Sequence, residues 1–153
     1  MKKLLLALLL ALLLLPSVVF AEGSSVTWST ETIFTQGRPN IVIHTAAIVS
    51  DDAAGTASGV TTMRGKIICV TAFDGATTPT ASWDFTLKDA LGVDILGSAG
   101  TNVSATLGLN VMPLTAASGA AFVNGRPIYG TVTLAASAMG NAKTGTVKVY
   151  VEE

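Results

Sequence analysis

Three aspartates at a regular interval, Asp84, Asp89 and Asp94, are the residues best suited to chemistry in this sequence. Paired carboxylates carry out glycoside hydrolysis, and clusters of carboxylate oxygens bind hard cations such as Ca²⁺. Ala90 and Leu91 break the alternation of oxygen ligands that a calcium-binding loop uses. Aspartate is also common at turns, because its carboxylate accepts hydrogen bonds from nearby backbone. We therefore predict turn and strand-edge roles for the three aspartates, and calcium binding stays open as the alternative.

His44 and Cys69 are the only histidine and the only cysteine. A nucleophilic triad or a Cys-His pair would have to use His44, and the sequence contains no Gly-x-Ser-x-Gly elbow. Cys69 lies in an apolar run, so we expect a buried small hydrophobe and not a reactive thiolate. One histidine and one cysteine are too few for a zinc site. The sequence therefore predicts no catalytic, metal-binding or cofactor-binding residues, and a protein that is not an enzyme.

Four aromatic residues, Trp28, Trp83, Phe85 and Phe122, are candidates for a sugar-binding platform. Trp83 and Phe85 alternate with polar residues in the stretch 82–88, which is the period of a strand with one buried face. Aromatic side chains at strand spacing belong to the core more often than to a binding platform. The alternation predicts that Trp83 and Phe85 lie in the core.

The N-terminus has the pattern of a secretory signal peptide. Lys2 and Lys3 precede a run of leucine and alanine from 4 to 15, and Ala21 provides a small residue for cleavage. We predict a helical signal peptide at 1–21 and one exported domain at 22–153, in the periplasm or outside the cell. The apolar run is too short for a stable membrane anchor, which needs about 20 residues.

The charge of the exported domain excludes one class of function. Without Lys2 and Lys3 the chain keeps seven basic and ten acidic residues, a net charge of −3. Nucleic-acid binding needs clustered Lys and Arg, so we expect no nucleic-acid partner. With a single cysteine, the domain cannot form an internal disulfide, and we expect it to rely on packing or assembly.

Short apolar runs separated by turn residues predict an all-β fold. They favour seven to nine short strands and no long helix after the leader, as in a single antiparallel β-sandwich of immunoglobulin-like or jelly-roll-like type. A short loop ending at Gly92 suits a hairpin between 82–88 and 93–96. The predicted strands are 26–34, 41–49, 60–63, 66–73, 82–88, 93–96, 107–111, 128–135 and 146–151.

Residues 79–97 resemble the signature of a family of small tailed-phage and prophage structural proteins. The signature is a Pro-Thr, an aromatic-Asp-hydrophobic-Thr-Leu strand, and then Asp-x-x-Gly-x-Asp-x-Leu. Residues 140–151 resemble the closing hairpin of that family, and 65–71 fits its preceding strand. The similarity extends over most of the domain, and its motifs are structural.

This resemblance implies a virion-associated structural protein, as a head decoration or a tail-linked module. Its implied partners are copies of itself and phage coat or tail proteins, and its implied location is the virion. The alternative function is an exported binding module that recognises a glycan or a cell-surface partner through the loops 51–59 and 97–121.

Overall fold

The structure is a computed structural model, which describes residues 23–51, 53–79, 82–104, 108–111 and 125–153. This part of the chain folds into eight strands, and every pairing between them is antiparallel. The all-β prediction is therefore confirmed. The strands are β1 (Ser25–Ile33), β2 (Ile41–Val49), β3 (Ala57–Asp74), β4 (Ser82–Lys88), β5 (Val103–Ser104), β6 (Leu109–Val111), β7 (Arg126–Ser137) and β8 (Thr144–Glu152).

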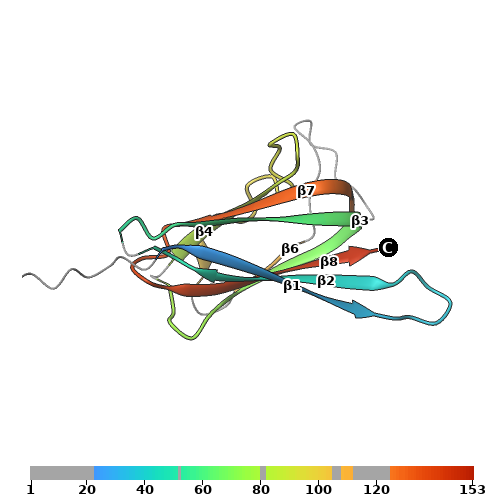
Figure 1. The fold of residues 1–153 in the computed structure, drawn as a ribbon, viewed down its shortest axis with the longest axis horizontal. Coiled ribbons are helices and arrows are strands. Elements are labelled where there is room, and N and C mark those ends of the chain that lie inside the picture. Colours follow the sequence, from blue (N-terminus) through green and yellow to red (C-terminus); the bar gives the residue numbers. More distant parts are fainter. Residues whose placement is uncertain (1–22, 52, 80–81, 105–107, 112–124) are drawn as a thin grey trace, which may run out of the picture.

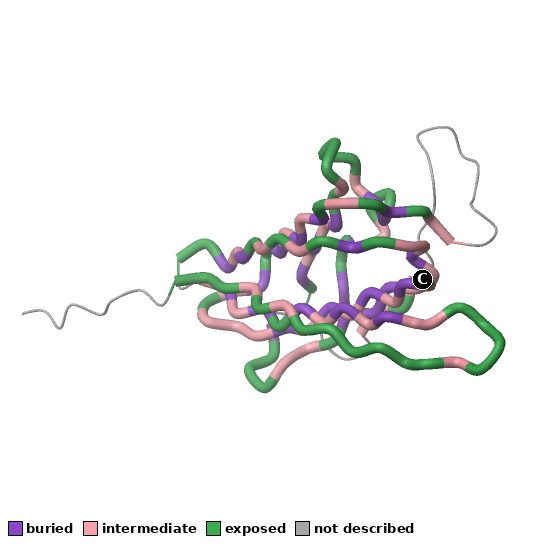
Figure 2. The backbone as a smooth tube through the Cα atoms, turned by 45° about the vertical axis from the view of Figure 1, so that its right-hand side comes forward, coloured by how far each residue is buried: buried purple, intermediate pink, exposed green. Residues whose placement is uncertain are grey.

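The strands form one largely continuous sheet, in the order β1-β2-β8-β3-β7-β4-β5, with β6 paired to β3. The structure thus differs from the predicted sandwich, in which two separate sheets would face each other. The long strand β3 joins the two halves, because its first part pairs with β7 and its second part with β8. The sheet bends along β3, and the two halves enclose the core (Figures 1 and 2).

Glycine allows this bend. Gly65 in the middle of β3 has a φ of 125°, and a Cβ atom there would collide with the carbonyl oxygen of Glu152 in β8. Gly130 in the neighbouring β7 has a φ of 122°. A register shift between Ile67 and Cys69 adds a β-bulge just after Gly65. The segments 60–63 and 66–73, predicted as separate strands, are therefore parts of one bent strand.

The core lies between the two halves of the sheet. Trp83, Phe85 and Leu87 of β4 point inward and are at most 1% exposed, as their alternation predicts. The rings of Trp83 and Phe85 lie with their centroids 5.7 Å apart. Their neighbours in the buried cluster include Ala46, Ile48, Met63, Ile67, Val70, Val132, Leu134, Val147, Val149 and Val151.

The predicted hairpin after β4 is only partly correct. Gly92 has the positive φ expected at the end of the turn, 78°. Residues 93–96 do not form a second strand, because only the single bridge between Lys88 and Asp94 is made there. The chain instead curls back along β4, where the Phe85 N–H donates to the Gly100 carbonyl at 2.8 Å. The loop at 89–100 therefore lies along β4 and forms backbone hydrogen bonds with it.

The signal peptide predicted at 1–21 and the aromatic residue Phe122 lie outside the described residues. Within the ranges that the structure describes, no helix has the length and apolar character needed to cross a membrane.

Candidate functional site

Asp94 and Asp84 hold the loop that covers β4. The Asp94 carboxylate accepts hydrogen bonds from the backbone N–H groups of Leu87, Leu96 and Ser98, at 3.3, 3.1 and 2.8 Å. Asp84 accepts one from the N–H of Asn102 at 2.7 Å. Both side chains thus tie β4 to the chain that follows it, which is the strand-edge role that the sequence predicts.

Asp89 closes the turn after β4 and pairs with β7. Its Oδ1 atom accepts from the N–H groups of Leu91 and Val93, each at 3.0 Å. Its Oδ2 atom lies 2.9 Å from Nη2 of Arg126, and the two side chains are only 15% and 16% exposed. Sequence reasoning missed Arg126, because Gly-Arg-Pro indicates a turn, whereas Arg126 is the first residue of β7.

A fourth aspartate has the same kind of role. Asp51 follows β2, and its Oδ1 atom accepts from the N–H groups of Ala54 and Thr56 at 2.8 and 3.2 Å. These hydrogen bonds, with the bond from Thr56 as the largest cause, hold the pKa of the Asp51 carboxyl below its usual value. These four aspartates therefore organise loops by accepting backbone N–H groups.

The carboxylate oxygens of Asp89 and Asp94 are occupied by N–H donors, so a bound cation would have to compete with the backbone and with Arg126. Across the described ranges, no three His, Cys, Asp or Glu side chains are grouped as metal ligands would be. The geometry therefore favours structural roles for the three aspartates over calcium binding.

His44 is a core residue of β2. It is 5% exposed, and neither of its ring nitrogens has a hydrogen-bond partner among the described residues. Burial lowers the pKa of the imidazole, and the carboxylate of Glu153 offsets this in part. A catalytic histidine would be hydrogen-bonded to a nucleophile or to an orienting carboxylate, and the described residues provide neither.

Cys69 lies on the outward face of the sheet, opposite Tyr150. The thiol is partly exposed and donates to Oδ1 of Asn110 at 3.0 Å, so the expectation of a buried small hydrophobe is wrong. The cause is the β-bulge at Ile68, which changes the alternation and turns Cys69 away from the core. Burial of the thiol still raises its pKa, which disfavours the reactive thiolate.

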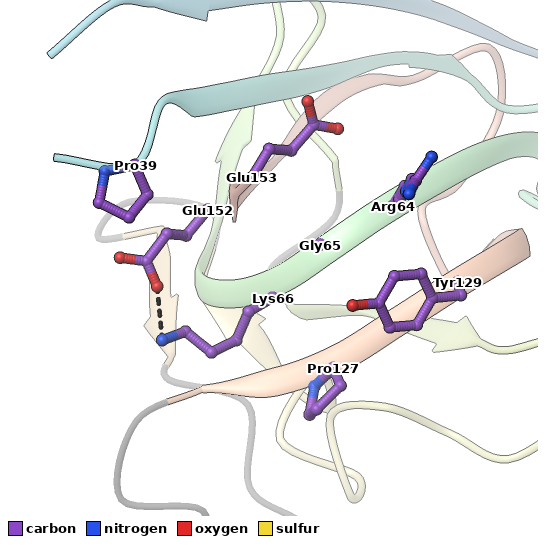
Figure 3. Close-up of a pocket in the computed structure, with 8 residues that line it drawn as sticks. All are labelled: Pro39, Arg64, Gly65, Lys66, Pro127, Tyr129, Glu152 and Glu153. Carbon is purple, nitrogen blue, oxygen red and sulfur yellow. Dashed lines mark ion pairs between the residues drawn. The ribbon is translucent and has the colours of Figure 1, made fainter.

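A groove opens beside the bend in β3 (Figure 3). Its volume is about 700 Å³. Tyr129 on one wall is 72% exposed. On the opposite side Lys66 pairs with Glu152, with the Nζ and Oε2 atoms 2.5 Å apart. The groove is lined by Pro39, Arg64, Gly65, Lys66, Pro127, Tyr129, Glu152 and Glu153.

The β1–β2 hairpin forms an arm that projects beyond the body of the molecule (Figures 1 and 2). Val26 and Trp28, in the first half of β1, pack against the core. Residues 29–34 are all exposed, and Phe34 at the tip is 81% exposed. The sequence predicts the two strands, but no feature of the sequence separates the covered half of β1 from the bare half.

Comparisons of this chain with protein-family models, with curated proteins and with solved structures found no match.

Proposed function

We propose that this protein is a non-enzymatic structural protein that assembles into oligomers, as a phage or prophage component attached to the virion head or tail. The observation that carries the proposal is the projecting arm. Ile33 and Phe34, at its tip, are 45% and 81% exposed. Large apolar side chains exposed on a projection favour contact with another protein surface.

The phage assignment rests on the resemblance of residues 79–97, and the roles of these residues agree with a structural signature. Trp83, Phe85 and Leu87 fill the core, while Asp89 and Asp94 fix the loop along β4. In this proposal the predicted sandwich is replaced by one bent sheet, and the two halves of that sheet are the two layers that face each other. Export through the predicted signal peptide, or incorporation into a virion, remains part of the proposal.

Size-exclusion chromatography with light scattering tests the assembly. We expect a defined oligomer, and we expect Phe34→Ser to shift it toward smaller species. Leu91→Ser is the matched control, because Leu91 is 89% exposed but lies in the turn after β4, away from the arm. A strict monomer that is absent from purified particles would contradict the proposal.

A second candidate function, an exported module that binds a glycan or a cell-surface partner, is favoured by the groove beside Gly65. Exposed Tyr129 on its wall could stack on a sugar ring, and the charged groups nearby could hydrogen-bond to hydroxyls. Trp83 cannot serve as the platform, because it is fully buried. A glycan array tests this function: signal that Tyr129→Ala abolishes and Val60→Ala preserves would support it, and no signal would count against it.

A further inference from the structure

The outer edge of β1 is open. β1 pairs with β2 through nine consecutive residue pairs without a register shift. In the described part of the chain, no other strand pairs with β1, and no backbone hydrogen bond to residues 25–33 is made from outside this hairpin. The N–H and C=O groups of alternate residues therefore point away from the sheet, where they can bind another extended chain.

The side chains of β1 do not protect this edge. Edge strands in monomeric proteins are usually short, or carry lysine, proline or a bulge that blocks pairing. The sequence of β1, Ser-Val-Thr-Trp-Ser-Thr-Glu-Thr-Ile, contains neither lysine nor proline, and its ladder has no bulge. Its one charged residue is Glu31. A nine-residue regular edge of this kind is suited to pairing.

We infer that β1 pairs antiparallel with β1 of a second copy of this chain, about a two-fold axis at Ser29. This inference rests on the proposed function and names the surface that performs the assembly. The register around Ser29 pairs all nine residues of β1. It sets Glu31 against Thr27 of the copy, and Ile33 against Ser25 of the copy, so that no two like charges are opposed.

The difference in burial between the two halves of β1 favours a second copy of this chain as the partner at the open edge. The first half is covered on its inner face, since Val26 lies against Gly59 of β3 and Trp28 against the core. The second half, residues 29–33, is exposed along its whole length. Antiparallel pairing sets the bare half of each strand beside the covered half of its copy. The tip of each arm then reaches toward the body of the other molecule, where Phe34 can be buried.

Cysteine cross-linking tests the register, in the full chain with Cys69→Ala as background. Opposed residues of an antiparallel pair have Cα atoms about 4.5–5.5 Å apart, within the range of a disulfide. Ser29→Cys should therefore form a disulfide-linked dimer under mild oxidation. Thr27→Cys and Glu31→Cys should not form dimers alone, because each lies roughly 13 Å from its own copy. An equal mixture of these two variants should form the cross-link.

The outcomes separate the inference from the proposed function. An oligomer in light scattering without the Ser29→Cys cross-link would overturn the β1 pairing while the assembly function stood. A dimer formed by Thr27→Cys alone would overturn the register. A cross-link from Ser29→Cys to a different polypeptide would assign the edge to another partner and overturn the self-pairing. A monomer under all conditions would overturn both proposals.

Discussion

At the scale of single residues, the polar side chains that attract attention in the sequence stabilise the fold. Asp94 accepts three backbone N–H groups, and Asp89 accepts two and pairs with Arg126. His44, in contrast, is buried without a hydrogen-bond partner in the part of the chain that the structure describes. The aspartates therefore support the fold through these hydrogen bonds and the ion pair, whereas burial of His44 disfavours its charged form.

The buried imidazole should make stability depend on pH. Burial lowers the pKa of His44 from the ordinary 6.5, so below that pH the unfolded chain binds a proton more readily than the folded protein. The free energy of unfolding should then fall as the pH drops below 6.5, by at most about 1.4 kcal/mol per pH unit. Urea unfolding at a series of pH values should show this loss in the wild type and a smaller one in His44→Leu.

Glu153 provides a control for that experiment, because its carboxylate raises the pKa of His44 and so acts against burial. Glu153→Gln should lower the pKa of His44 further and extend the loss of stability to lower pH. Equal pH dependence in the wild type and in His44→Leu would show that the imidazole is not responsible.

The structural role of Asp89 predicts a loss of stability and no response to calcium. Asp89→Ala removes the acceptor of two N–H groups and leaves the mostly buried Arg126 without its partner, which should cost about 1–3 kcal/mol. Chemical denaturation would measure this loss, with Lys88→Gln, at an exposed charge next to Asp89, as the control. Excess calcium should not change the melting temperature of the wild type, and a clear rise would favour a metal site at these aspartates.

At the scale of the elements, glycine decides where the sheet bends. Gly65→Ala introduces a Cβ at a positive φ and against the carbonyl of Glu152, so we expect a loss of about 2–4 kcal/mol. Gly130→Ala is the matched control: its φ is also positive, but among the described residues no atom beyond its two chain neighbours lies within 4 Å of the added Cβ. It should cost only the backbone strain, about 1–2 kcal/mol. Equal losses in thermal unfolding would contradict a steric role for Gly65.

The periodicity of the sequence predicts most strands but not the bend. β2 occupies 41–49 as predicted, and Val147, Val149 and Val151 of β8 face the core. The continuity of β3 could not be predicted, because Gly65 interrupts the apolar pattern in the way that a loop does. The role of Asp89 at a turn follows from local chemistry, whereas its pairing with Arg126 depends on contact between distant segments.

At the scale of the whole molecule, β8 and β1 have the same length of nine residues but differ greatly in what they contribute to stability. β8 lies between β2 and β3 and contributes three fully buried valines, while β1 lies at an edge and is mostly exposed. Deleting 144–153 should therefore abolish the cooperative unfolding transition. Deleting 23–33 should destabilise the protein through the loss of Val26 and Trp28, but leave a folded body. Circular dichroism during thermal unfolding would compare the two, and a folded protein without β8 would contradict the central role of that strand.

The position of β8 also has a consequence for the time course of folding. β2 and β3 are neighbours along the chain, but β8, which begins about 70 residues after the end of β3, separates them in the sheet. The β1–β2 hairpin and the strands β3, β7 and β4 therefore cannot join into one sheet until β8 has been made and lies between β2 and β3. Such long-range pairing makes folding slow, and it leaves the earlier strands without their final neighbour until the last part of the chain has been made. In the proposed export, this delay would keep the sheet incomplete while the chain crosses the membrane.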